Sequence, residues 1–152
     1  MEFLHYSSHL LTKIEDREYL KKQDEDVKPY GFWFTPEIEN NWKDWCKSEN
    51  FSLESLNYKY QLEIDLTNIL KLETFEQILE FSKRFKNRHT LDWKKVSSLY
   101  SGILITPYIW KARNTFETNW YYTWDCASGC VWDISVIKDF SLIEEGENVL
   151  YE

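Results

Sequence analysis

A strict alternation of apolar and polar residues over 58–66 constrains the fold more than any other part of the sequence. Its apolar positions are Tyr58, Tyr60, Leu62, Ile64 and Leu66, and its polar positions are Lys59, Gln61, Glu63 and Asp65. Successive side chains of a strand point to opposite faces of a sheet, so this pattern predicts a β-strand. One face of that strand is buried, and the other face is in contact with water.

Three further stretches predict strands of different kinds. Residues 2–8 (EFLHYSS) predict a short strand that carries His5 toward its end, and 31–35 (GFWFT) predict a strand of bulky residues. Residues 102–106 (GILIT) are a continuous apolar run after a glycine. Such a run is typical of a strand that is buried on both faces.

The region 120–134 (WYYTWDCASGCVWDI) is rich in tryptophan and small residues. We expect one strand over 120–124, a tight turn over 126–129 and a second strand over 130–134. The tryptophans of this region are expected to lie partly in the core. The carboxylate and the hydroxyl beside the turn, Asp125 and Ser128, are expected to face a pocket.

Three helices are predicted by apolar residues at helical spacing. The first follows Pro36, the second begins after Thr74, which has capping-box spacing to Gln77, and the third follows Thr90 as its expected N-cap. Their apolar stripes are Trp42, Trp45 and Cys46 in the first, Phe75, Ile78, Leu79 and Phe85 in the second, and Trp93, Val96 and Tyr100 in the third.

These elements predict an α+β fold with a split, mostly antiparallel β-sheet and two or three helices. The helices are clustered along the chain instead of alternating with strands, which disfavours a parallel α/β architecture. The composition, 43% hydrophobic and 18% aromatic, is that of a globular protein. We expect a single domain over 1–152, because this length suffices for one core.

Charge and targeting signals restrict the partners of the chain. Its formal net charge is −8, so long-range attraction to DNA or RNA phosphates is not expected. The local basic cluster at 83–89 is interpreted as a solvated helix end. No segment approaches membrane-spanning length, and no signal-like apolar run stands at the N-terminus. With an odd number of cysteines, these features predict reduced thiols in the cytoplasm, with no membrane partner.

Several common chemistries lack their sequence signatures. Cys126 and Cys130 are separated by three residues, not by the two of redox and zinc motifs. No second Cys or His pair completes a tetrahedral site, so no metal is expected and the thiols are predicted to be unpaired. The sequence also contains no phosphate loop, dinucleotide-binding fingerprint, HExxH motif or nucleophile elbow.

The remaining unusual residues together suit a nicotinamide riboside. Aromatic walls can stack on the ring, hydroxyls and a histidine can bind the sugar and the carboxamide, and a carboxylate can lie near the reacting carbon. The residues that offer these groups are His5, Ser7, Trp33, Thr35, Trp45, Trp124, Asp125, Ser128 and Trp132.

The order of these motifs resembles the ADP-ribosyltransferase superfamily, in its histidine-containing branch, which includes the poly(ADP-ribose) polymerases and small bacterial and phage proteins. FLHYSS is similar to the first strand of that branch, and KPYGFWFTPEIENNWKDWC is similar to its second motif, a Gly-led aromatic strand followed by a helix. LYSGILITPY resembles a later core strand, and SGCVWDISVI resembles the closing strand.

The resemblance implies roles for individual residues. His5 and Ser7 would bind the nicotinamide-side ribose, Gly31 and Trp33 would belong to the strand of the second motif, and Trp45 would stack on nicotinamide. In the closing strand, the position of the family's catalytic glutamate falls on or near Ser128. Either Asp125 takes the acidic role, or the chain does not transfer in the usual way, or it binds a ligand without catalysis.

The function implied is an enzyme that uses NAD as a substrate, releases nicotinamide and transfers ADP-ribose to a macromolecule. Asp125 and His5 would be its catalytic residues. Gly31, Trp33, Thr35, Trp45 and Ser128 would bind NAD together with Ser7, and Arg17 or Arg113 would meet the pyrophosphate. A protein acceptor is favoured over a nucleic acid because the chain is acidic. The alternative is a catalytically silent domain of the same fold that binds a nucleotide or a protein.

Overall fold

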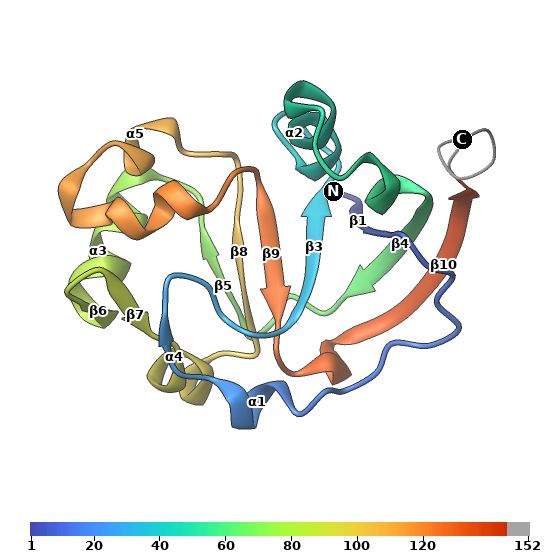
Figure 1. Ribbon diagram of the computed structural model, residues 1–152. Helices are drawn as coiled ribbons and strands as arrows, with labels where there is room; N and C mark the ends of the chain where they lie inside the picture. Colours follow the sequence, from blue (N-terminus) through green and yellow to red (C-terminus); the bar gives the residue numbers. More distant parts are fainter. Residues whose placement is uncertain (146–152) are drawn as a thin grey trace.

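A seven-stranded sheet of order β10-β4-β1-β3-β9-β8-β5 is the centre of the computed structural model, which describes residues 1–145 (Figure 1). Only β5 and β8 pair in parallel, and the other neighbours pair antiparallel. The expected α+β class and mostly antiparallel sheet are therefore confirmed. The strands are β1 (Phe3–Ser7), β3 (Phe32–Pro36), β4 (Tyr58–Ile64), β5 (Ile69–Leu72), β8 (Gly102–Ile105), β9 (Ser128–Val131) and β10 (Ile137–Glu145).

A second, three-stranded sheet and several helices surround this centre. The small sheet has the order β2-β7-β6, with β2 at Glu25–Asp26, β6 at Lys86–Asn87 and β7 at Thr90–Asp92. The α-helices are α1 (Tyr19–Lys22), α2 (Trp42–Glu49), α3 (Phe75–Phe85), α4 (Trp93–Leu99) and α5 (Trp110–Arg113). The 3-10 helices are η1 (Leu53–Leu56), η2 (Phe116–Thr123) and η3 (Ile134–Val136). Figure 1 shows α3, α4 and α5 on the β5–β8 side, whereas α2 lies beside β3 and β1.

The alternation over 58–66 produces β4, which lies between β1 and β10. Tyr60 and Leu62 are buried, as the period of two predicts. In β8, Ile103 and Ile105 join one hydrophobic cluster while Leu104 joins the other. The strand is therefore buried on both faces, which confirms the interpretation of the apolar run.

Two of the expected helix starts have different outcomes. Thr74 caps α3 as predicted, because its side chain accepts a hydrogen bond from the Gln77 amide at 3.2 Å. The expectation that Thr90 caps the next helix is wrong. Asp92 is the N-cap of α4 and accepts from the Lys95 amide at 3.1 Å, whereas Thr90 lies in β7.

The expected strand–turn–strand over 120–134 is also wrong. Residues 120–123 belong to the 3-10 helix η2, and β9 already begins at Ser128, inside the expected turn. The cause is packing. The Trp120 indole donates to Ser82 Oγ of α3 at 2.6 Å, and the fully buried Tyr121 ring stacks on Tyr108 with centroids 5.1 Å apart. Strand propensity of aromatic residues reflects such packing more than a backbone preference.

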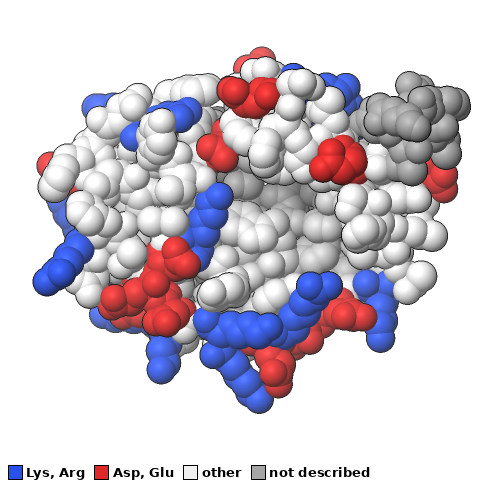
Figure 2. Space-filling model, in the orientation of Figure 1, with Lys and Arg blue, Asp and Glu red and all other residues white. Residues whose placement is uncertain are grey.

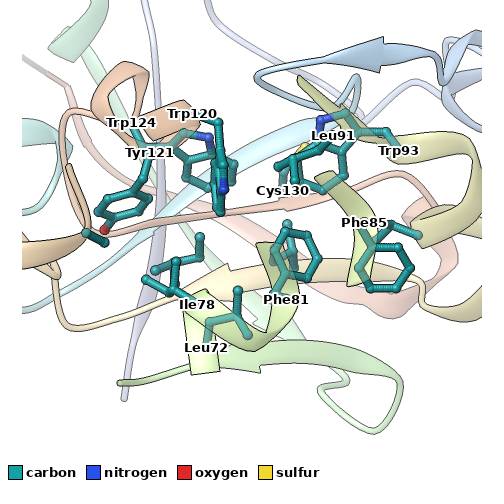
Figure 3. Packing of buried hydrophobic residues seen from close by; sticks show 14 of the residues in the cluster. Leu72, Ile78, Phe81, Phe85, Leu91, Trp93, Trp120, Tyr121, Trp124 and Cys130 are labelled. Carbon is teal, nitrogen blue, oxygen red and sulfur yellow. The ribbon is translucent and has the colours of Figure 1, made fainter. Parts of the chain in front are cut away.

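Four tryptophans, Trp93, Trp120, Trp124 and Trp132, are fully buried in the larger cluster, of which Figure 3 shows a part. Each indole N–H is hydrogen-bonded, to Asp26 O, Ser82 Oγ, Val27 O and Tyr100 O respectively. A buried N–H without a partner would cost free energy, so these bonds allow large rings in the core. They also attach the segment 26–27 to the core.

Candidate functional site

A pocket of about 380 Å³ is lined by residues of β1, β3, the start of α2 and the segment before β9. This volume lies within the range of small-molecule sites, roughly 300–1,000 Å³. Figure 2 shows a hollow with an uncharged floor, with Lys and Arg side chains along its lower rim and carboxylates above it. The lining residues are Leu4, His5, Tyr6, Lys28, Trp33, Phe34, Thr35, Trp42, Ser55, Trp124, Asp125, Cys126 and Ser128.

The pocket lies where β1 and β3 stop pairing. Their register is Phe3 with Pro36 and Leu4 with Thr35, and no further pair follows. At this point the His5 imidazole bonds across the gap, with Nδ1 at 2.6 Å from the carbonyl oxygen of Trp33. A side chain thus takes the place of a ladder hydrogen bond between the two strands.

The His5 ring is held in one orientation, and its surroundings favour the neutral form. A carbonyl only accepts, so Nδ1 donates, and in the neutral ring Nε2 is left as an acceptor. The ring also stacks on Phe32, with centroids 4.1 Å apart. Burial lowers the pKa of His5, while the bond to Trp33 acts in the opposite direction. The neutral imidazole is therefore favoured near neutral pH.

Thr35 and Ser128 line the pocket but use their hydroxyls within the protein. Thr35 Oγ1 donates to Ala127 O at 2.7 Å and accepts from the Trp42 amide at 3.0 Å. Ser128 Oγ donates to Cys126 O at 3.2 Å. These bonds connect β3, α2 and the segment before β9, so both hydroxyls fix the shape of the pocket.

Asp125 is the only carboxylate and Lys28 the only ammonium among the lining residues. Neither is in an ion pair with another residue of the described range 1–145. Asp125 is half-buried and directly follows the buried Trp124. A carboxylate in this partly apolar setting interacts more strongly with a nearby cation than it would in water.

Aromatic rings form the walls of the pocket. Trp33 meets Trp124 edge to face, with centroids 5.1 Å apart. Trp42 lines the pocket and stacks on Trp45 at 5.4 Å, and Trp45 in turn contacts Phe51. Trp45 itself is not a lining residue, so Trp42, one turn earlier on the same helical stripe, stands where the sequence placed Trp45.

Two other predicted residues lie outside the pocket lining. Ser7 Oγ accepts from the His9 amide at 3.1 Å. Gly31 has a packing role, because a Cβ at this position would lie 2.4 Å from Cys130 Sγ and 2.7 Å from Val131 O. The arginines proposed for the pyrophosphate do not line the pocket either. Arg17 is exposed, and the Arg113 guanidinium lies 4.8 Å from the Tyr122 ring centroid.

Sequence reasoning missed seven lining residues, which are Leu4, Tyr6, Lys28, Phe34, Trp42, Ser55 and Cys126. Trp42 could have been found, since it lies on the predicted apolar stripe. Burial raises the pKa of Tyr6 to about 12, with Glu144, Glu37 and Asp44 adding to the shift. The Tyr6 hydroxyl is therefore protonated and can donate a hydrogen bond into the pocket.

The three cysteines are free and buried thiols. Burial is the main cause that raises the pKa of Cys126 to about 12 and that of Cys46 to about 11. Thiolate chemistry at Cys126 is thereby suppressed. Within residues 1–145, no group of three or more His, Cys, Asp or Glu side chains is placed to hold a metal ion. No helix in this range is long and apolar enough to cross a bilayer.

No protein-family model matches the chain, and neither does any curated protein or solved structure. The chemistry open to the site follows from its own geometry. That geometry offers aromatic walls, one carboxylate, one ammonium, a neutral imidazole and a phenol.

Proposed function

We propose that this pocket binds the nicotinamide-ribosyl part of NAD and that the chain transfers ADP-ribose to a macromolecule, with release of nicotinamide. One observation carries the proposal. Five of the eight site residues predicted from the sequence line one pocket, although their segments lie up to 123 residues apart. They are His5, Trp33, Thr35, Asp125 and Ser128. The split between β1 and β3 at His5 supports an ADP-ribosyltransferase-like form of the α+β fold.

The chemistry needs few protein groups. The bond between the ribose C1′ and the nicotinamide nitrogen breaks, and the electron pair leaves with nicotinamide, which becomes neutral. Positive charge develops on the sugar, and the carboxylate of Asp125 stabilises it. A nucleophile of the acceptor then bonds to C1′ and loses its proton to solvent or to Asp125.

The apolar walls favour the reaction in two ways. Trp33 and Trp42 can stack on the nicotinamide ring, and the walls exclude water that would otherwise hydrolyse the sugar cation. His5 is neutral, so its Nε2 can accept a hydrogen bond from a ribose hydroxyl without adding positive charge beside the cation. The acceptor is a macromolecule, with protein favoured over nucleic acid by the net charge of −8.

A specific observation favours a second function, ligand binding without turnover. The hydroxyls of Thr35 and Ser128 are engaged within the protein, and β9 carries no glutamate. In this alternative the same pocket holds a nucleotide or a partner residue, and Asp125 only contributes to binding.

The test measures nicotinamide release and label transfer after incubation of the protein with adenine-labelled NAD and a cell lysate. Wild type and Trp45→Ala should release nicotinamide, whereas Trp33→Ala should not, because only Trp33 lines the pocket. Both tryptophans are half-buried, so the pair is matched for stability effects. Thermal stabilisation by NAD without nicotinamide release would favour the silent alternative. If NAD neither stabilises the protein nor is consumed, the NAD proposal is wrong.

A further inference from the structure

The segment 23–30, a loop that includes the short strand β2, is rich in charged residues and is anchored by several hydrogen bonds. The buried Gln23 side chain bonds to Tyr30 in both directions, with Nε2 donating to Tyr30 O at 2.6 Å and Oε1 accepting from the Tyr30 amide at 3.2 Å. Pro29 is buried between these anchor points. The loop is thus closed on itself by an amide side chain that water does not reach.

Two core tryptophans hold the middle of the same loop. The Trp93 indole donates to Asp26 O at 2.9 Å, and the Trp124 indole donates to Val27 O at 3.1 Å. Both rings are fully buried, so neither can move without opening the core. The backbone just before Lys28 is therefore attached to the core by two hydrogen bonds.

This loop presents Lys28 at the pocket. Lys28 is the only ammonium among the lining residues, and no carboxylate of residues 1–145 lies within ion-pair distance of it. Because Trp124 bonds to Val27, the loop lies next to the segment that carries Asp125. One wall of the pocket thus offers a carboxylate and a cation on two adjacent segments.

We infer that Lys28 is the phosphate-binding residue of this pocket, so that the pocket selects ligands with a phosphate on the ribose bound beside Asp125. The inference rests on the proposed function and adds the residue by which the pocket distinguishes a nicotinamide nucleotide from the free nucleoside. In a nicotinamide nucleotide the reacting carbon and the phosphate belong to the same ribose, which suits two groups on adjacent segments. Lys28 takes the role that the sequence assigned to Arg17 or Arg113.

A cation carried by an anchored backbone beside apolar walls is effective for this purpose. The loop is ordered before binding, so little backbone entropy is lost when the phosphate arrives. A hydrogen bond between a charged donor and a phosphate contributes about 1.5–3 kcal/mol, or roughly a tenfold to hundredfold change in affinity.

The experiment is isothermal titration calorimetry with NAD, nicotinamide riboside and ADP against four proteins. These are wild type, Lys28→Ala, Lys28→Arg and, as a control, Lys22→Ala on the exposed helix α1. Lys28→Ala should weaken NAD and ADP binding by at least about tenfold and change riboside binding by less than about twofold. Lys28→Arg should retain most of the affinity, and Lys22→Ala should match wild type.

The outcomes separate this inference from the proposed function. If Lys28→Ala binds NAD with the affinity of wild type, the role of Lys28 is overturned but the proposed function is not. The same conclusion follows if Lys28→Ala loses as much affinity for nicotinamide riboside as for NAD. If wild type binds ADP through Lys28 but neither NAD nor the riboside, the phosphate site stands and the NAD proposal fails. If wild type binds none of the three ligands, both fail. Because Lys28 is exposed to solvent, its substitution should leave the fold intact. A thermal unfolding scan of each variant verifies this.

Discussion

Asp125 is the residue on which the choice between transfer and silent binding depends. Two of the pocket hydroxyls, those of Thr35 and Ser128, are satisfied by internal hydrogen bonds, so they hold the same arrangement with or without a ligand. Asp125 has no ion-pair partner within residues 1–145 and remains available to a developing cation.

The first prediction compares two half-buried aspartates. Asp125→Asn should lower the rate of nicotinamide release by about a hundredfold or more, because one charge-stabilising contact is lost. Asp133→Asn should retain the rate. Asp133 Oδ1 accepts from the Ser135 amide at 3.1 Å as the N-cap of η3, and an asparagine oxygen can replace it. The measurement is the initial rate of each folded variant. A dead Asp133→Asn with an active Asp125→Asn would reverse the assignment.

The second prediction concerns His5 and pH. Because burial lowers its pKa in the folded protein, the unfolded chain binds more protons between the folded pKa and the unfolded value of about 6.5. Stability from this group is therefore complete above the unfolded pKa and is lost as the pH falls through that window. In His5→Asn the free energy of unfolding should fall less between about pH 7.5 and about pH 5.5 than in wild type.

Urea unfolding at both pH values measures this difference. The control is His9→Asn, since His9 is exposed and should leave the wild-type dependence unchanged. Asparagine places an amide donor near the position of Nδ1, which preserves the contact to Trp33. An unchanged pH dependence in His5→Asn would show that His5 does not titrate differently in the two states.

At the residue scale, the site was predictable where chemistry and strand period coincide. His5 and Thr35 were identified because a histidine and a hydroxyl stand in otherwise apolar strands, and Trp33 was identified through the family resemblance. Lys28 was not, because its role depends on indoles at 93 and 124 that fix its loop from far along the chain. Trp42 and Trp45 share one helical stripe, and spacing alone cannot tell which of them meets the pocket.

At the scale of elements, β9 is packed tightly between its two neighbours. It lies between β3 and β8, and Gly129 faces the Phe34 ring. A Cβ at Gly129 would lie 2.3 Å from Phe34 Cζ, so the ring occupies the space of the missing side chain. Phe34 also lines the pocket, which couples this strand pair to the site.

The third prediction follows from this contact. Gly129→Ala should destabilise the protein by about 1–3 kcal/mol through overpacking. In the double variant Gly129→Ala, Phe34→Leu the loss should be smaller than the sum of the two single losses, because leucine frees the space that alanine needs. Denaturant unfolding of all four proteins measures the coupling. If the loss of stability in the double variant equals the sum of the two single losses, the contact between Gly129 and Phe34 is contradicted.

Element boundaries were predictable where local signals act alone. The capping box at Thr74 produced α3, and the alternation over 58–66 produced β4. At α4, Asp92 and Thr90 are both good caps, and the pairing of β7 with β2 and β6 leaves Thr90 in a strand. In η2, tertiary packing of Trp120 and Tyr121 overrides their strand propensity. Neither outcome is encoded within a few neighbouring residues.

For the whole molecule, the fourth prediction is that all three thiols are protected by the global fold. Cys46, Cys126 and Cys130 are buried, and burial raises the pKa of each of them. In the native state a disulfide exchange reagent should react at least about a hundredfold more slowly than in denaturant, where all three thiols should react. Stopped-flow absorbance gives both rates. A thiol that reacts rapidly in the folded protein would show a local opening at that site.

The α+β class of the whole molecule was predictable from the order in which strand-like and helix-like spacings of apolar residues follow one another along the chain. The order of the strands in the sheet was not. β10 pairs with β4 and β5 pairs with β8, so both sheet edges depend on contacts between distant segments. An apolar run in the sequence identifies a strand but does not specify the strand with which it pairs. The small sheet β2-β7-β6 was missed for another reason, since strands of two or three residues carry no readable period.

The distribution of indoles gives the protein an optical reporter of its own. Trp33 and Trp42 are half-buried walls of the pocket, whereas Trp93, Trp120 and Trp132 are sealed in the core away from it. Trp124 is a core residue that also lines the pocket. A ring-bearing ligand stacked on Trp33 and Trp42 would quench their emission without shifting the spectrum of the core. Unfolding would instead move the emission of the core tryptophans to longer wavelength. One fluorescence spectrum can thus distinguish occupancy of the pocket from loss of the fold, without any attached dye.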